Sequence, residues 1–238
     1  MEGNVTKVKK LLREGAKVNQ LFKTQSEYGE SYQRSAITAL VLTLVSCVYR
    51  NITPRSMSRL LQLNPWETKM NESTKAELAK ILINAGAKPD MADTHRWHNS
   101  ALHYVQSARV MCILLSAYPL PVIDCLNLLN QTPLHTQAYM GEATSCQLLI
   151  DAKANVHAVD KSGNTPLHIA VQCGHDNVVT TLLMAKADAL EIKNNEGYNA
   201  IHMKRASFAK QNDVDRCHDV MRTYLENAGL VCFTRPVI

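Results

Sequence analysis

The chain has 238 residues, a net charge of +5 and an aromatic content of only 5%. Its longest apolar run, AITALVLTLVSCVY at 36–49, is interrupted by Thr and Ser, and it is shorter than the roughly 20 residues that span a bilayer. The cations are scattered and are not interleaved with aromatic residues, which disfavours nucleic-acid binding and mildly favours an acidic protein partner. We therefore expect no membrane insertion and, without a charged leader before an apolar segment, no secretion.

The first predicted element is a helix with its exit turn. GNVTKVKKLLREGAKVN at 3–19 ends in Gly-Ala-Lys, and the same tripeptide occurs in NAGAKPD at 84–90. No partner helix precedes it, so the chain is either cut from a longer protein, which we favour, or begins with a half-repeat cap. The polar stretch 20–34, with two Tyr, is predicted to enlarge the hairpin loop that follows.

The strongest pattern is a repeat of 33 residues. QTPLHTQAYMGEATSCQLLIDAKANVHAVD at 131–160 aligns with NTPLHIAVQCGHDNVVTTLLMAKADALEIK at 164–193. In each copy Thr can cap a helix, Pro can take its first position and Gly can end it before a second helix. Weaker matches to Thr-Pro-Leu-His end at Val41, His103 and His202. The pattern resembles the ankyrin repeat.

That resemblance implies an all-α ankyrin-repeat solenoid of about five helix pairs plus an N-terminal half-repeat, with two long insertions. We expect one domain over 1–238, because a solenoid of this size uses the whole chain. Its predicted parts are a half-repeat 1–19, a hairpin-loop insertion 20–34, a repeat with an insertion 35–92, and repeats 93–126, 127–159, 160–192 and 193–238.

Departures from the repeat mark special segments. About 27 residues are inserted at roughly 49–75, where Thr53 and Pro54 can start a short helix that either covers the array or recognises a partner. The repeat after it lacks three residues between its helices, which must be short or irregularly joined. Pro119 and Pro121 then replace the usual Gly-Ala-Asp exit. The last repeat gains nine residues, RASFAKQND.

Catalytic or metal chemistry finds little support in the sequence. Seven cysteines without tight spacing favour reduced, buried thiols. His95, His98 and His103 lack the paired spacing of a closed zinc site, and the resemblance implies that His103 is structural. Cys173 with His175 lacks a third group to orient a base. We expect no cofactor, no metal and no enzyme activity.

The resemblance implies binding to another protein through the hairpin tips and the inner helices. We expect a monomeric, cytoplasmic or nuclear protein; the alternative is a regulatory or targeting domain of a larger enzyme or channel. Leu128 and Leu129 are either exposed or turned inwards to fill the gap left by the shortened helices. The candidate contact residues are Trp97, Leu128, Leu129, Gln131, Tyr139, Met140, Lys161, Ser162, Asn164, Gln172 and Cys173, with Trp66 of the insertion.

Two residues are candidates for modification. Asn19 and His157 occupy the exit-turn position that, by resemblance, is hydroxylated in many ankyrin proteins by an oxygen-dependent asparaginyl hydroxylase. Each has a leucine eight residues earlier, at Leu11 and Leu149. The competing interpretation is that both side chains simply bond the turn.

Overall fold

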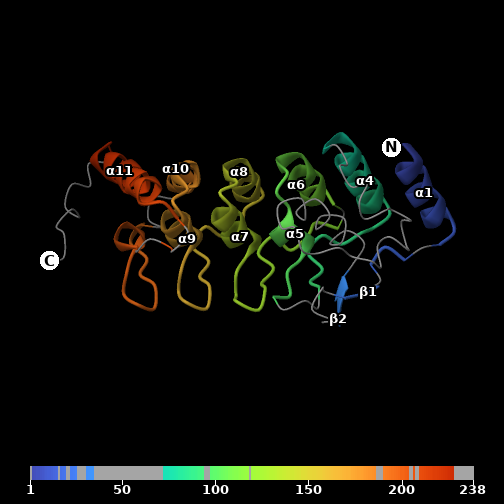
Figure 1. The fold of residues 1–238 in the computed structure, drawn as a ribbon, viewed down its shortest axis with the longest axis horizontal. Helices are drawn as coiled ribbons and strands as arrows, with labels where there is room; N and C mark the ends of the chain where they lie inside the picture. Colours follow the sequence, from blue (N-terminus) through green and yellow to red (C-terminus); the bar gives the residue numbers. More distant parts are fainter. Residues whose placement is uncertain are drawn as a thin grey trace. The chain divides into compact units, whose positions relative to one another are not determined.

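A computed structural model describes residues 2–15, 17–19, 22–25, 31–34, 72–93, 97–117, 119–185, 190–203, 206 and 209–227 (Figure 1). The chain divides into two compact units, Met1–Leu129 and Asn130–Ile238. The division falls inside a predicted hairpin, and the prediction of a single domain stays a prediction. Three features of the sequence analysis lie outside the described residues: the apolar run at 36–49, the short helix predicted in the insertion, and Trp66.

The first unit contains helices and one small ribbon. Helix α4 packs between α1 and α6, and the three follow one another in Figure 1. Where we expected only an enlarged loop at 20–34, two strands pair antiparallel, with Phe22 opposite Arg34. The elements are α1 (Glu2–Arg13), β1 (Phe22–Gln25), β2 (Ser31–Arg34), α4 (Glu72–Asn84), α5 (Ala101–Tyr104) and α6 (Ala108–Leu115).

The shortened repeat has the irregular join that its length predicts. Helix α5 has four residues, and Val105 after it is extended, with φ −66° and ψ 128°. The chain stays non-helical until Ser107, whose side chain accepts a hydrogen bond from the Val110 N–H and so caps α6. The loss of three residues therefore removes the end of the inner helix together with its glycine turn.

The second unit stacks its helices in two layers. Helices α8, α10 and α11 form one row and α7 and α9 lie beneath them (Figure 1), with packing between α7 and α9, α8 and α10, and α10 and α11. Leu134, Leu149, Leu167 and Leu182 are fully buried between the layers. The elements are α7 (Pro133–Met140), α8 (Ala143–Asp151), α9 (Pro166–Cys173), α10 (Asp176–Ala185), a 3-10 turn η2 (Ala200–His202) and α11 (Gln211–Asn227).

Local chemistry explains where these helices begin and end. Helices α7 and α9 start with Pro after a capping Thr, and they end at Gly141 and Gly174, whose φ values are 81° and 79°. Glycine is favoured there because a Cβ disfavours left-handed backbone. In the last repeat the inner helix is the single turn η2, and α11 has 17 residues.

Candidate protein-binding surface

The hairpins between repeats are held by their own side chains. Asp160 Oδ1 accepts hydrogen bonds of 2.9 Å from the Ser162 N–H and of 2.9 Å from the Asn164 N–H. In the next hairpin Asn194 Oδ1 accepts two of 3.0 Å, from the N–H groups of Glu196 and Tyr198. Because the turn is bonded internally, its tip side chains need not contribute to folding.

Neighbouring hairpins are joined by backbone and asparagine hydrogen bonds. In the second unit the Asn195 N–H donates to the Ser162 carbonyl at 3.0 Å, and Asn194 Nδ2 donates to Asn164 Oδ1 at 2.9 Å. The first unit repeats the arrangement, because the Leu128 N–H donates to the Trp97 carbonyl at 2.9 Å. These bonds fix the spacing of adjacent tips and so present their side chains as one rigid surface within each unit.

The histidines of the repeat motif are structural, as the resemblance implied. The Thr165 N–H donates to His168 Nδ1 at 3.2 Å, so that nitrogen is unprotonated and Nε2 carries the hydrogen that bonds the Tyr198 carbonyl at 3.1 Å. His135 makes the same bonds with Thr132 and with the Asn164 carbonyl. Each histidine thus ties its own helix start to the following hairpin.

From this geometry we expect the second unit to lose stability in acid. Burial lowers the pKa of His168, outweighing the carbonyl of Tyr198 and the charge of Asp160, which raise it. Burial also lowers the pKa of His218. The unfolded chain therefore binds protons that the folded chain does not, so the free energy of unfolding should fall as the pH drops below about 6.5, the ordinary histidine value.

Denaturant unfolding between neutral and mildly acidic pH measures this effect. His168→Gln keeps an acceptor and a donor but does not titrate, so it should flatten the pH dependence without abolishing it, because His218 remains. An equal slope in wild type and variant would contradict the assignment of the acid sensitivity to His168.

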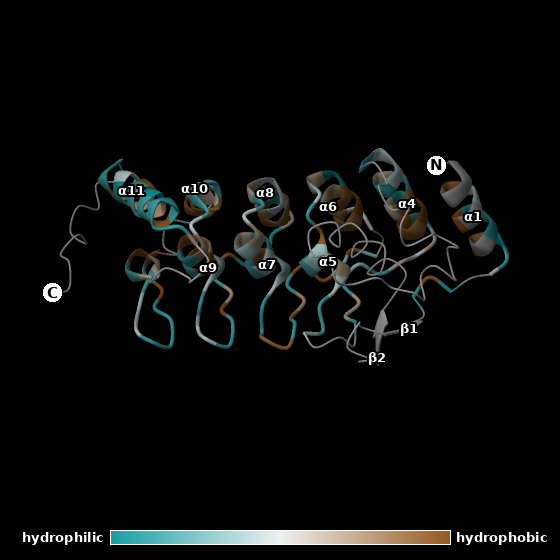
Figure 2. Cartoon of the chain, in the orientation of Figure 1, coloured by the Kyte–Doolittle hydropathy of each residue, from teal (hydrophilic) through white to brown (hydrophobic). Residues whose placement is uncertain are grey.

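The predicted apolar tip residues of the first unit are exposed. Trp97 is 40% and Leu128 46% exposed, while Leu129 is half-buried. Figure 2 shows a hydrophobic tip on the hairpin that precedes α7, in contrast to the hydrophilic tips before α9 and η2. Leu128 therefore faces solvent and does not fill the space left by the shortened helices.

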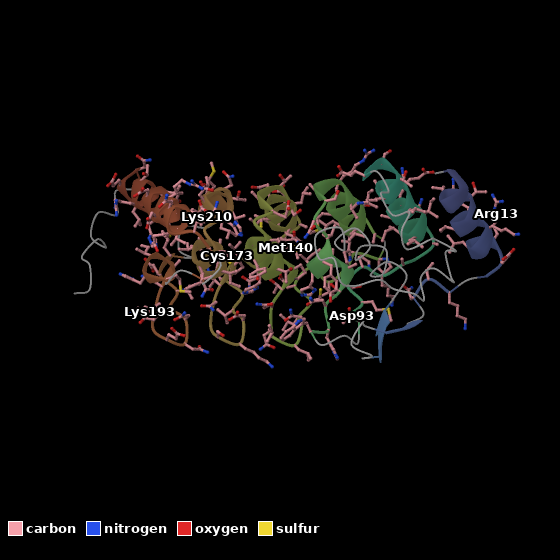
Figure 3. The ribbon with its side chains drawn as sticks, in the orientation of Figure 1. Arg13, Asp93, Met140, Cys173, Lys193 and Lys210 are labelled. Atoms are coloured by element: carbon pink, nitrogen blue, oxygen red, sulfur yellow. The ribbon has the colours of Figure 1, made fainter. Side chains whose placement is uncertain are left out.

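The candidates of the second unit differ in accessibility. Tyr139, near the C-terminal end of α7, is 48% exposed. Gln131, Met140 and Gln172 are half-buried, and Lys161 and Ser162 are exposed. The remaining two are less available: the side chain of Asn164 bonds Asn194, and Cys173 is buried at the end of α9 (Figure 3).

Cys173 and His175 have structural surroundings. Burial raises the pKa of the Cys173 thiol to about 11, which leaves it protonated and a poor nucleophile at neutral pH. His175 Nε2 donates to the Tyr139 carbonyl at 3.0 Å, and its ring lies over Gly141, where an added Cβ would come within 2.8 Å of Nδ1. His175 therefore bridges two repeats, and we leave Cys173 out of the proposed surface.

The described cysteines are not paired in disulfides, and the described side chains form no metal-binding group. Cys112, Cys125, Cys146, Cys173 and Cys217 are free, and burial raises the pKa of Cys146 and Cys217 to about 12. Within the described ranges, no group of three or more His, Cys, Asp or Glu side chains is placed to hold a metal ion. No helix in that part of the chain is long and apolar enough to cross a membrane.

Asn19 forms hydrogen bonds with the exit turn of the next repeat, that is, the turn that follows the outer helix α4. Its Oδ1 accepts from the Lys88 N–H at 2.8 Å and its Nδ2 donates to the Gly86 carbonyl at 2.7 Å. One repeat later, Asp90 Oδ2 accepts from the Val122 N–H at 2.9 Å. This recurrence supports the turn-bonding interpretation of Asn19, and hydroxylation of Asn19 or His157 stays a prediction.

The exit segment after α6 carries exposed apolar residues that were not predicted from the sequence. Among them, Leu120 is 80% exposed and Val122 60% exposed. The 33-residue register could have found them, because it aligns Leu120 with Lys153 and Val122 with Asn155.

Paired short helices joined by side-chain-bonded hairpins define a helical-repeat protein. The family profile described as "Ankyrin repeats (3 copies)" matches residues 69–195, which is more than half of the chain. The chain belongs to the ankyrin-repeat family, and the predicted all-α ankyrin class is confirmed. Ankyrin repeats generally mediate protein–protein interaction, and the fold is typically non-catalytic.

The three relatives described next match only part of this chain and are much longer than it. The nuclear factor NF-kappa-B p105 subunit of Gallus gallus is 37% identical over 84 residues, 34% of this chain and 8% of its own length. Rabankyrin-5 of Homo sapiens is 33% identical over 117 residues, 42% of this chain and 10% of its own length. Palmitoyltransferase AKR1 of Lachancea kluyveri is 30% identical over 127 residues, 51% of this chain and 17% of its own length.

A solved structure supports the fold over nearly the whole chain. The crystal structure of EF0377, an ankyrin-repeat protein, superposes with a TM-score of 0.65 and covers 94% of each chain. Its sequence identity to this chain is 18%, so the similarity concerns the fold alone.

Proposed function

We propose that this chain binds another protein through its hairpin tips and inner helices, with Trp97 and Leu128 as apolar anchors. The exposure of both side chains on hydrogen-bonded neighbouring hairpins carries the proposal. Trp is enriched among the residues that dominate interface energies, and a rigid turn loses little conformational entropy when it binds. Tyr139 and Met140 are further contact candidates in the second unit.

A paired substitution tests the anchors. We expect Trp97→Ser with Leu128→Ser to abolish capture of at least one protein that wild type retains in quantitative affinity mass spectrometry, while the melting temperature stays within about 3 °C. Met184→Ser is the matched control, because Met184 on α10 is 79% exposed and belongs to no hairpin. An unchanged set of captured proteins in the double variant would remove Trp97 and Leu128 from the interface.

A second candidate function follows from the size of the similar proteins. The chain spans between 8% and 17% of the lengths of the three relatives described above. We therefore also propose that it acts as a regulatory or targeting part of a larger protein, and the mass of the endogenous protein on a denaturing gel with an antibody against 130–190 tests this. A location in the cytoplasm or nucleus is part of the proposal, supported by the free thiols.

A further inference from the structure

The exit segment after α6 carries three exposed apolar side chains within a few residues of one another. Leu120 is 80%, Val122 60% and Leu126 57% exposed; we call these three residues the exit ledge. The Cys125 N–H donates to the Val122 carbonyl at 3.4 Å, which closes a four-residue turn between Val122 and Leu126. The ledge lies between α6 and the hairpin tip at Leu128, and it belongs to no inner helix.

The first two ledge positions are exposed in the next repeat as well, but the residues there are polar. In the next repeat the register places Lys153 and Asn155, both exposed, at the positions of Leu120 and Val122. Folding thus accepts polar residues at both sites, and burial in this chain does not explain the leucine and the valine. Clustered exposed apolar side chains on a protein surface commonly mark an interaction site.

Two prolines and a side-chain hydrogen bond restrict the backbone of the ledge in the unbound protein. Pro119 and Pro121 hold their own φ values and restrict Leu120 to extended conformations. Pro121 is buried while Leu120 and Val122 are exposed, which matches the alternation of side chains along an extended segment. Asp90 Oδ2 accepts the Val122 N–H at 2.9 Å. The two prolines have no N–H groups and the Val122 N–H is already bonded, which disfavours regular strand pairing, so we expect recognition through side chains.

Two carboxylates adjoin the ledge: Asp90 Oδ2 accepts the Val122 N–H at 2.9 Å, and Asp124 stands between Val122 and Leu126 in the sequence. Burial raises the pKa of Cys125 to about 11, Ser100 lowers it by a hydrogen bond, and the carboxylates of Asp90 and Asp124 raise it further. Both carboxylates therefore lie within electrostatic reach of a residue inside the exit segment. The whole chain carries a net charge of +5, but charge complementarity with these two carboxylates favours a cationic partner at this place.

We propose that the exit ledge docks a basic amphipathic segment of a partner protein, with apolar side chains against Leu120, Val122 and Leu126 and Lys or Arg towards Asp90 and Asp124. This site is separate from the hairpin tips. It also differs from the acidic partner that the net charge alone favours.

Two short synthetic peptides test the proposal, one of Leu and Lys at helical spacing and its counterpart with Glu in place of Lys. We expect the Lys peptide to shift backbone amide resonances of residues 119–126 in an NMR titration of the full chain and the Glu peptide to leave them unshifted. Leu120→Gln with Val122→Asn should weaken the Lys peptide roughly tenfold, and Asp124→Asn should weaken it less.

Controls separate the ledge from other surfaces. Met184→Gln removes an equally exposed apolar side chain on α10 and should leave the affinity unchanged, as should the Trp97→Ser and Leu128→Ser pair. Equal shifts by both peptides, shifts centred on other residues, or unchanged affinity in the ledge double variant with a wild-type melting curve would each overturn the proposal. Loss of binding in the Trp97 and Leu128 pair alone would place the site on the hairpin tips instead.

Discussion

Leu167→Ala is expected to lower the free energy of unfolding by about 2 to 5 kcal/mol, the usual range for truncating a buried leucine. Leu167 is fully buried in α9, a helix that packs against α7, α10 and α11. A cavity there removes contacts with both neighbouring repeats. Since repeats are stabilised by nearest-neighbour stacking, the loss should spread through the second unit.

Urea melts followed by circular dichroism measure the effect. Leu134→Ala, in the same position of the preceding repeat and also fully buried, should behave alike. Lys161→Ala, on an exposed hairpin tip, should change the stability by less than about 0.5 kcal/mol. If Leu167→Ala were as mild as Lys161→Ala, the repeat register and the assignment of the core would both be wrong.

Gly163→Ala is expected to cost about 2 to 5 kcal/mol, although it adds a single methyl group. Gly163 has φ 75°, and an added Cβ would lie 2.7 Å from the backbone nitrogen of Asn195. That nitrogen donates to the Ser162 carbonyl at 3.0 Å, so relief of the clash would break the bond between adjacent hairpins. The backbone nitrogen of Asn195 cannot move away from the added Cβ by a rotamer change, as the end of a flexible side chain could.

Gly197→Ala is the matched control for this prediction. Gly197 occupies the equivalent place in the next hairpin, with φ 83°, but a Cβ there would meet nothing within 4 Å. It should therefore cost about 1 to 2 kcal/mol, from the left-handed backbone alone. Thermal and urea unfolding of both variants gives the difference, and equal losses would show that hairpin spacing contributes nothing to stability.

The regular parts of the fold were predictable because a local signal sets each of them. Thr165 and Pro166 start a helix, Gly174 ends it, and the missing three residues after His103 leave α5 with only four residues. Such rules act over a few residues and need no knowledge of what packs above them. The same register placed Trp97 at a hairpin tip, whereas it left open whether Leu128 is exposed or turned inwards.

The burial of Cys173 and the pairing of β1 with β2 could not be predicted from the repeat register, which carries no information about contacts between distant residues. The sequence places Cys173 on the inner-helix surface, yet it is buried; an added Cβ on the next residue, Gly174, would meet Asp213 of α11 at 2.8 Å. The start of α11 at Asp213 therefore lies against the end of α9. The paired strands Phe22–Gln25 and Ser31–Arg34 were not predicted because both are short and polar, with little alternation of apolar residues.

The main-chain N–H groups of Lys88 and Val122 donate to side-chain oxygens of the preceding repeat, Asn19 Oδ1 and Asp90 Oδ2. Every amino acid except proline supplies such an N–H. The residue that donates can therefore change in evolution without loss of this hydrogen bond. Lysine at 88 and valine at 122 show how far its chemistry has diverged inside one molecule. New binding preferences can arise there by single substitutions, while the neighbouring acceptor preserves the architecture.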